Sequence, residues 1–97
     1  MFRLEPLRLW MSRDIHHIIE NLTPEEQAKL RGTSKAELAR FHRGLGTGLR
    51  NAFRSRRFPG LSAFCHAVVR RSNAPPNPDI LSAVAIREVW RALQSEP

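Results

Sequence analysis

Residues 38–58 read LARFHRGLGTGLRNAFRSRRF, a stretch that combines an apolar helical pattern with three alternate glycines and six arginines. Its apolar residues recur at the three- and four-residue spacing of a helix that packs on a core. They are Leu38, Phe41, Leu45, Leu49, Ala52 and Phe53, with His42 on the same face. The pattern predicts a central helix that anchors the fold and displays positive charge on its other faces.

Glycine inside a helix costs up to about 1 kcal/mol relative to alanine, so Gly44, Gly46 and Gly48 need a compensating role. Their spacing favours close approach of another backbone or of a ligand, with a simple kink as the alternative. They do not form a phosphate-binding loop, because no strand precedes them and no Gly-Lys-Ser/Thr end follows them.

Two capping patterns precede this stretch. Residues 23–26, TPEE, combine an N-cap threonine, a proline at the first helical position and a glutamate that closes a capping box. They predict a short helix that ends at Gly32 in a left-handed cap. Residues 34–37, SKAE, repeat the pattern and predict the start of the glycine-bearing helix, which runs to about Phe53.

The N-terminal residues predict an arm followed by a helix. Residues 1–11 alternate apolar and charged side chains around Pro6, which is typical of a short extended arm or a frayed lead-in. Ser12 then serves as the N-cap of a helix over residues 13–21.

The C-terminal half predicts two more helices. Pro59 opens one that ends near Arg71, and Asn77 caps the last, in which Pro78 holds the first position. No strand pair or internal repeat competes with these helices. Residues 12–97 are therefore expected to form a single compact all-α domain of four to five short helices.

Composition limits the class of protein. The 97 residues are 41% apolar, enough for one modest core and too few for a two-domain enzyme with a cleft between its halves. The apolar runs are far short of a membrane span, and the N-terminus lacks the apolar core of a signal peptide. Cys65 is the single cysteine, which excludes an internal disulfide. We expect a cytoplasmic protein without a membrane-spanning segment.

The net charge of +7 is unevenly distributed. Residues 38–78 carry eight arginines and no acidic residue, whereas basic and acidic residues are nearly balanced in the rest of the chain. Such a block is typical of a surface for a polyanion or an acidic protein, although the arginines can also simply solvate the surface.

Two motifs in the chain resemble those of a known family. Residues 41–51 read FHRGLGTGLRN, and residues 78–82 read PDILS. The combination of Phe-His-x-x-Leu-Gly-x-x-Leu-Arg-Asn with Pro-Asp-x-x-Ser resembles a family of uncharacterised small bacterial and phage-associated proteins, known only as a domain of unknown function. The resemblance implies a compact helical domain and no particular activity. The chain departs from the family pattern at residues 55–57, where Ser-Arg-Arg stands in place of Gly-Leu-Trp, and at Ile80, where a second acid is usual.

The motif residues also predict a structural contact. The Arg50 guanidinium is expected to reach the Asp79 carboxylate at the start of the last helix, which would fix the relative orientation of the two helices. Asn51 and Ser82 are expected to complete hydrogen bonds nearby. The full set of structural motif residues is His42, Gly46, Arg50, Asn51, Asp79 and Ser82.

Catalysis is not expected. A nucleophile built from Cys65, His42 and Asp79 can be written down, but Cys65 occupies a core-like position in its helix. His16 and His17 lie on adjacent faces of their helix, and His66 has no second ligand one turn away. We expect no metal site and no cofactor.

Two binding functions fit the pattern. In the first, the chain binds nucleic acid or a nucleoprotein machine through phosphate contacts that do not read bases. In the second, a protein encoded by a phage or mobile element, such as an anti-CRISPR-like inhibitor of host defence, docks on an acidic protein with Trp10, Phe58 or Trp90 as anchors. Both use the arginines of one surface: Arg40, Arg43, Arg50, Arg54, Arg56, Arg57, Arg70 and Arg71.

Overall fold

The computed structural model describes residues 5–95, which form five α-helices and one 3-10 helix and contain no strand. The elements are α1 (Glu5–Asn21), α2 (Pro24–Arg31), η1 (Lys35–Phe41), α3 (Leu45–Arg54), α4 (Pro59–Arg71) and α5 (Pro78–Ser95). The all-α prediction is confirmed, and the helices enclose one core. No helix in this range is both long and apolar enough to cross a membrane.

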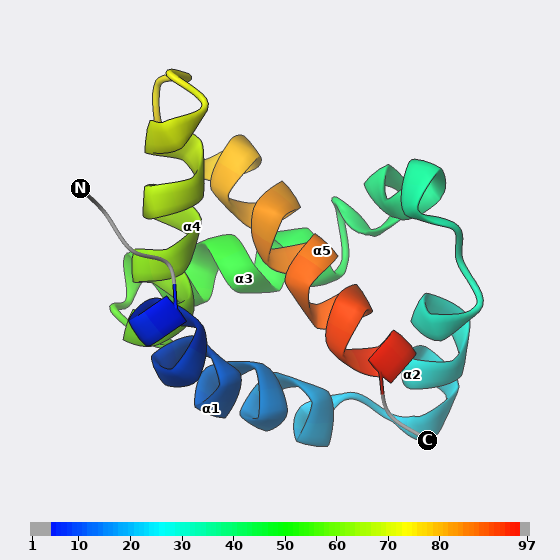
Figure 1. Ribbon diagram of the computed structural model, residues 1–97. Coiled ribbons are helices and arrows are strands. Elements are labelled where there is room, and N and C mark those ends of the chain that lie inside the picture. Colours follow the sequence, from blue (N-terminus) through cyan, green and yellow to red (C-terminus); the bar gives the residue numbers. More distant parts are fainter. Residues whose placement is uncertain (1–4, 96–97) are drawn as a thin grey trace.

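The last helix, α5, is the centre of the fold, because it packs against each of the other five helices. Figure 1 shows α5 crossing the molecule with α3 behind it, α1 and α4 on one side and α2 on the other. Its 18 residues are apolar on several faces, so Leu81, Ile86, Val89 and Leu93 are all buried. The glycine-bearing stretch expected at the centre is therefore one of the surrounding elements.

The prediction of one long helix over residues 35–53 is wrong, because η1 ends at Phe41 and α3 begins at Leu45. The apolar spacing from Leu38 to Phe41 is three residues, which fits a 3-10 helix as well as an α-helix. Of the three glycines, only Gly46 has neighbours within 4 Å of a Cβ built on it: the Phe41 carbonyl oxygen at 3.4 Å, Ile86 Cδ1 at 3.5 Å and Arg50 Nη1 at 3.2 Å.

The prediction of a second capping box, at residues 34–37, is also wrong. The Ser34 hydroxyl donates to the Glu37 carboxylate at 3.0 Å and caps no backbone amide. The first capping box is confirmed: the Glu26 amide donates to Thr23 Oγ1 at 3.1 Å, and the Thr23 amide donates to Glu26 Oε1 at 2.8 Å. Gly32 ends α2 as predicted but has φ −80°, so its backbone is right-handed.

The N-terminal arm was predicted too long. α1 begins at Glu5, so residues 5–11 are helical, and residues 1–4 lie outside the described part of the chain. Met11 is 7% exposed and extends the buried stripe of Ile15 and Ile18 by one turn, which explains why the helix starts early. The Ser12 hydroxyl donates to the Leu9 carbonyl oxygen inside α1 and is no N-cap.

The starts of α4 and α5 agree with the sequence prediction, at Pro59 and Pro78. The Asn77 side chain caps α5 by accepting the Ile80 amide at 2.9 Å. The cap of α4 comes from another helix, because Asp14 of α1 accepts the Leu61 amide at 3.0 Å. This contact fixes α1 against the start of α4, next to the turn that carries Arg54, Arg56 and Arg57.

Candidate arginine-rich binding surface

Three exposed arginines surround the turn between α3 and α4. Arg54, Arg56 and Arg57, together called the arginine corner below, form no ion pair with a carboxylate among the described residues. The turn is short, so the three guanidinium groups start from backbone positions within four residues of one another. Their charges are open to solvent and to a ligand.

Two backbone hydrogen bonds define the conformation of the arginine corner. The Arg57 amide donates to the Ala52 carbonyl oxygen at 2.8 Å, and the Arg56 amide donates to the Phe53 carbonyl oxygen at 3.0 Å. These two bonds are the pair that defines a Schellman motif, which glycine usually closes. Here Arg56 holds the left-handed position with φ 61°, and Phe58 has φ 55°. Non-glycine residues held in this conformation cost energy and tend to occur where a side chain is needed.

Aromatic side chains border the arginine corner. The Arg57 guanidinium lies 5.2 Å from the centre of the Phe58 ring, and that ring lies 6.3 Å from the ring of His17. Trp10, which is 50% exposed, lies against Gly60 at the start of α4. The surface therefore offers flat apolar rings beside positive charge.

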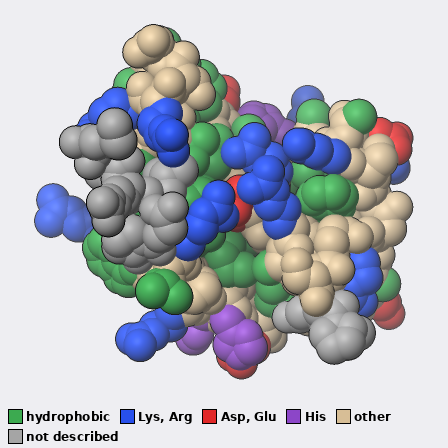
Figure 2. Space-filling view, in the orientation of Figure 1, with side chains coloured by type: hydrophobic (Ala, Val, Ile, Leu, Met, Phe, Trp, Pro, Cys, Tyr) green, Lys and Arg blue, Asp and Glu red, His purple; other side chains and the backbone are tan. Residues whose placement is uncertain are grey.

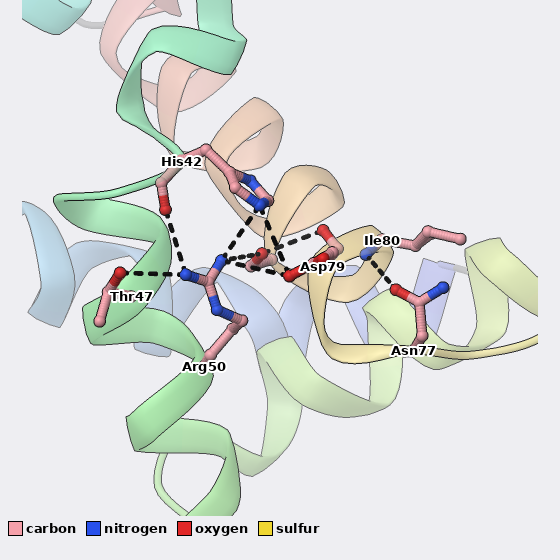
Figure 3. Close-up of polar contacts among 7 residues, drawn as sticks. His42, Thr47, Arg50, Asn77, Asp79 and Ile80 are labelled. Carbon is pink, nitrogen blue, oxygen red and sulfur yellow. Dashed lines mark hydrogen bonds and ion pairs between the residues drawn. The ribbon is translucent and has the colours of Figure 1, made fainter.

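Arg50 points into the fold instead of joining this surface. Its side chain is 19% exposed and extends from α3 toward the start of α5, as Figure 3 shows. It donates to Ser82 Oγ at 3.1 Å, Thr47 Oγ1 at 3.0 Å and the His42 carbonyl oxygen at 3.3 Å. The expected contact with Asp79 is present at 3.8 Å. Arg50 therefore ties α3 to the turn before it and to α5.

The other motif residues contribute unequally to this cluster. His42 Nε2 lies 3.5 Å from Asp79 Oδ1, and the Ser82 hydroxyl is buried. Gly46 lies beneath the Arg50 guanidinium, since a Cβ on Gly46 would lie 3.2 Å from Arg50 Nη1. Asn51 is exposed and makes none of the hydrogen bonds expected of it within residues 5–95. Thr47 was missed, although it lies three residues before Arg50 on the same helix face.

The remaining predicted arginines do not converge on the corner. Arg40 pairs with Glu37 at 3.8 Å, and Arg43 is exposed in the turn after η1. Arg70 and Arg71 are at the C-terminal end of α4, about 18 Å along the helix axis from Pro59. The single arginine surface expected from the charge pattern is therefore divided among separate places on the molecule.

Three arginines outside the acid-free block were missed. Arg8 of α1 and Arg87 and Arg91 of α5 surround the buried Glu88 and lie next to Arg71. No local pattern reveals this group, because it depends on how three helices pack.

Cys65 is fully buried, and burial raises the pKa of its thiol to about 12, with the Glu88 carboxylate adding to the effect. A thiol with that pKa is protonated at neutral pH and is a poor nucleophile. Among the described residues there is also no group of three or more His, Cys, Asp or Glu side chains placed to hold a metal ion.

Neither a family model nor a curated protein nor a solved structure matches this chain. The resemblance to an uncharacterised bacterial and phage-associated family therefore stays a prediction.

Proposed function

We propose that this chain is a small non-catalytic binding protein whose arginine corner contacts the phosphates of a nucleic acid. The observation that carries the proposal is the group of three exposed guanidiniums, without carboxylate partners in the described chain, on a backbone that holds Arg56 in a left-handed conformation. Arginine suits this task because its planar donors fit phosphate oxygens.

The aromatic border favours a single-stranded ligand or an unpaired end. Bases stack on exposed aromatic rings in proteins that bind single strands without sequence preference, and Trp10 offers such a ring beside the corner. Few uncharged polar side chains accompany the arginines, so little reading of base edges is expected.

The test is the salt dependence of binding. Fluorescence anisotropy would measure the affinity for a labelled single-stranded 20-mer and its duplex across a series of salt concentrations. The logarithm of the binding constant should fall linearly with the logarithm of salt, by about 0.7 per phosphate for the single strand and about 0.9 for the duplex. The double variant Arg56→Ala/Arg57→Ala should lower the slope by the contribution of about two phosphate contacts.

A matched control removes two exposed cations from elsewhere. Lys29→Ala/Lys35→Ala gives the same change in net charge on α2 and η1, and it should leave the slope nearly unchanged. Equal slopes for the two double variants would mean that the corner has no special role. Absence of binding to both probes at low salt would contradict the proposal as a whole.

A second candidate is docking on an acidic protein surface, as an inhibitor from a phage or mobile element would do. Leu9 and Trp10 favour it, because these consecutive residues of α1 are 79% and 50% exposed. Protein interfaces often depend on such an exposed tryptophan. In a pull-down, this partner would persist after nuclease treatment, and Trp10→Ala would weaken it more than Arg56→Ala/Arg57→Ala. Trp90 is no free anchor, because its indole donates to the Thr33 carbonyl oxygen at 2.8 Å.

A further inference from the structure

A buried carboxylate lies among arginines between α1, α4 and α5. The Glu88 side chain is 3% exposed, and three guanidiniums approach it. Arg91 Nη1 lies 3.3 Å from Oε2, Arg87 Nε lies 3.7 Å from Oε2, and Arg8 Nη1 lies 3.9 Å from Oε1. A buried carboxylate requires such partners, but a single cation would already balance its charge.

Arg71 adds a fourth positive charge at the same place. It lines a cavity of about 310 Å³ together with Arg8, Arg87, Glu88 and Arg91, over the side chains of Phe64 and Val68. Four guanidiniums and one carboxylate thus line the same cavity, which leaves an excess of three positive charges. Figure 2 shows basic side chains gathered on this face of the molecule, with an acidic side chain visible between them.

The arginines of this cavity have unused hydrogen-bond donors. Arg87 Nε is buried and has no hydrogen-bond partner, and Arg87 makes no other hydrogen bond within residues 5–95. Arg71 forms no ion pair with any described residue. The Arg8 guanidinium lies 5.1 Å from the centre of the Phe64 ring, and although its Nη1 is 3.9 Å from Glu88 Oε1, its side chain donates no hydrogen bond within residues 5–95.

Close guanidiniums repel one another, so the free protein carries a local electrostatic cost that Glu88 offsets only in part. An oxyanion with several acceptor atoms would relieve that cost. A phosphoryl group has a tetrahedral set of oxygens and up to two negative charges, and it accepts paired donors from several arginines at once. Its charge also matches the excess better than a second carboxylate would.

A neighbouring groove indicates what the phosphoryl group is attached to. Arg8, Glu88 and Arg91 also line a second cavity of about 400 Å³ between α1 and α5, along Met11 and Ile15. An organic group on the phosphate can lie in this groove against apolar side chains. Inorganic phosphate would leave it empty.

We propose that Arg8, Arg71, Arg87 and Arg91 form a binding site for the phosphoryl group of a small phosphate ester, with Glu88 as the buried carboxylate that holds the arginines together. This site is separate from the arginine corner, because Arg71 and the corner are at opposite ends of α4. It does not depend on the proposed nucleic-acid function.

The experiment titrates inorganic phosphate and phenyl phosphate into the protein at constant ionic strength, followed by amide chemical shifts. Saturable shifts around α1 and the α4–α5 region are expected, with phenyl phosphate the tighter ligand. Arg71→Ala should weaken both ligands by about tenfold, as expected for loss of a charged hydrogen bond. Arg71 is exposed, so this variant should keep the fold, and circular dichroism checks that it does.

The corner variant Arg56→Ala/Arg57→Ala is the matched control and should bind both ligands as the wild type does. Failure of that variant to bind nucleic acid, with phosphate binding intact, would separate the two sites. The proposal would be overturned if neither ligand caused saturable shifts at concentrations up to about 20 mM. A dissociation constant at that limit corresponds to little more than 2 kcal/mol of binding free energy. An equal response in Arg71→Ala and wild type would overturn the proposal too, and equal affinities for the two ligands would overturn the assignment of an ester.

Glu88→Gln gives an independent readout. Loss of the carboxylate leaves the arginines without their buried counter-charge and should lower the melting temperature. Phenyl phosphate should then raise the melting temperature of Glu88→Gln more than that of the wild type, because the ligand takes over the missing charge. A smaller rise than in the wild type would contradict the role given to Glu88.

Discussion

Gly60 faces the main chain of Trp10 so closely that a Cβ on Gly60 would lie 2.7 Å from the Trp10 carbonyl oxygen. A real Cβ does not come so near a backbone atom, so any other residue at this position must push α1 away from α4. The two helices also meet where Asp14 caps the Leu61 amide, at 3.0 Å. The close approach therefore determines how α1 lies beside the arginine corner.

Gly60→Ala should lower the free energy of unfolding by about 1–3 kcal/mol, the usual cost of forcing extra volume into a packed contact. Gly48→Ala is the control, because nothing lies within 4 Å of a Cβ there. In α3 that change should stabilise the protein by up to about 1 kcal/mol through helix propensity. Urea denaturation measures the free energy of unfolding of both variants. If both variants changed it in the same direction, the close contact between Gly60 and Trp10 would not explain the effect at Gly60.

Arg50 and Asp79 should differ in their contributions to stability even though they form one ion pair. Arg50→Ala should cost about 2 kcal/mol, because it leaves the buried Ser82 hydroxyl and the His42 carbonyl oxygen without a donor. Asp79→Ala should cost less than about 1 kcal/mol, since that carboxylate is 72% exposed and 3.8 Å from the guanidinium. Chemical denaturation of both variants checks the order.

Arg50→Lys tests the geometry of this contact. Lysine keeps the charge but cannot hold donors in the fixed fork that reaches several acceptors, so it should recover only part of the lost stability. If Asp79→Ala proved as costly as Arg50→Ala, the exposed ion pair would be the main contribution and the hydrogen bonds secondary. If Asp79→Ala left stability unchanged but abolished ligand binding, a structural role would be wrong.

The stability of the protein should fall at high pH because of Cys65. Burial raises the thiol pKa from 9.0 to about 12, so between these values the unfolded chain ionises while the folded protein keeps the proton. The unfolded state then binds fewer protons, and stability decreases with rising pH by up to about 1.4 kcal/mol per pH unit. The chain has no tyrosine, so Lys29 and Lys35 are the other side chains whose reference pKa lies in this range.

Cys65→Ala isolates this effect. Urea denaturation from pH 8 to 11 should show a steeper loss of stability in the wild type than in the variant. In the native wild type at neutral pH, alkylation of Cys65 should proceed only as fast as the protein opens. Rapid alkylation without unfolding would contradict the buried position of the thiol.

The local parts of the fold could be predicted, because a cap depends on residues a few positions apart. The Thr23 and Asn77 caps are of this kind. The break after Phe41 could not be predicted, since the apolar spacing there fits two helix types. Among the predicted motif residues, the contact of Arg50 with Asp79 was predictable from the complementary charges on the two helices. The Gly60 contact and the arginines around Glu88 were not, because they join residues of α1 to helices about fifty positions or more further along the chain.

Arg56 should show opposite effects on stability and on binding. It occupies the left-handed position of a Schellman motif, with φ 61°. Arg56→Gly removes the strain of a side chain there and should raise the free energy of unfolding by about 1 kcal/mol. The same change removes a cation from the corner. The slope of the logarithm of the binding constant against the logarithm of salt should therefore fall by the contribution of about one phosphate contact.

Two comparisons separate these effects. Arg56→Ala also removes the cation but keeps the strained backbone, so it should weaken binding without a comparable gain in stability. Asn73→Gly changes the equivalent position after α4, where φ is 57°, and should stabilise less because asparagine tolerates this conformation better than arginine does. If Arg56→Gly stabilised the protein and left binding unchanged, Arg56 would be only a strained cap, and the proposed contact with phosphate would have to rest on Arg54 and Arg57 alone.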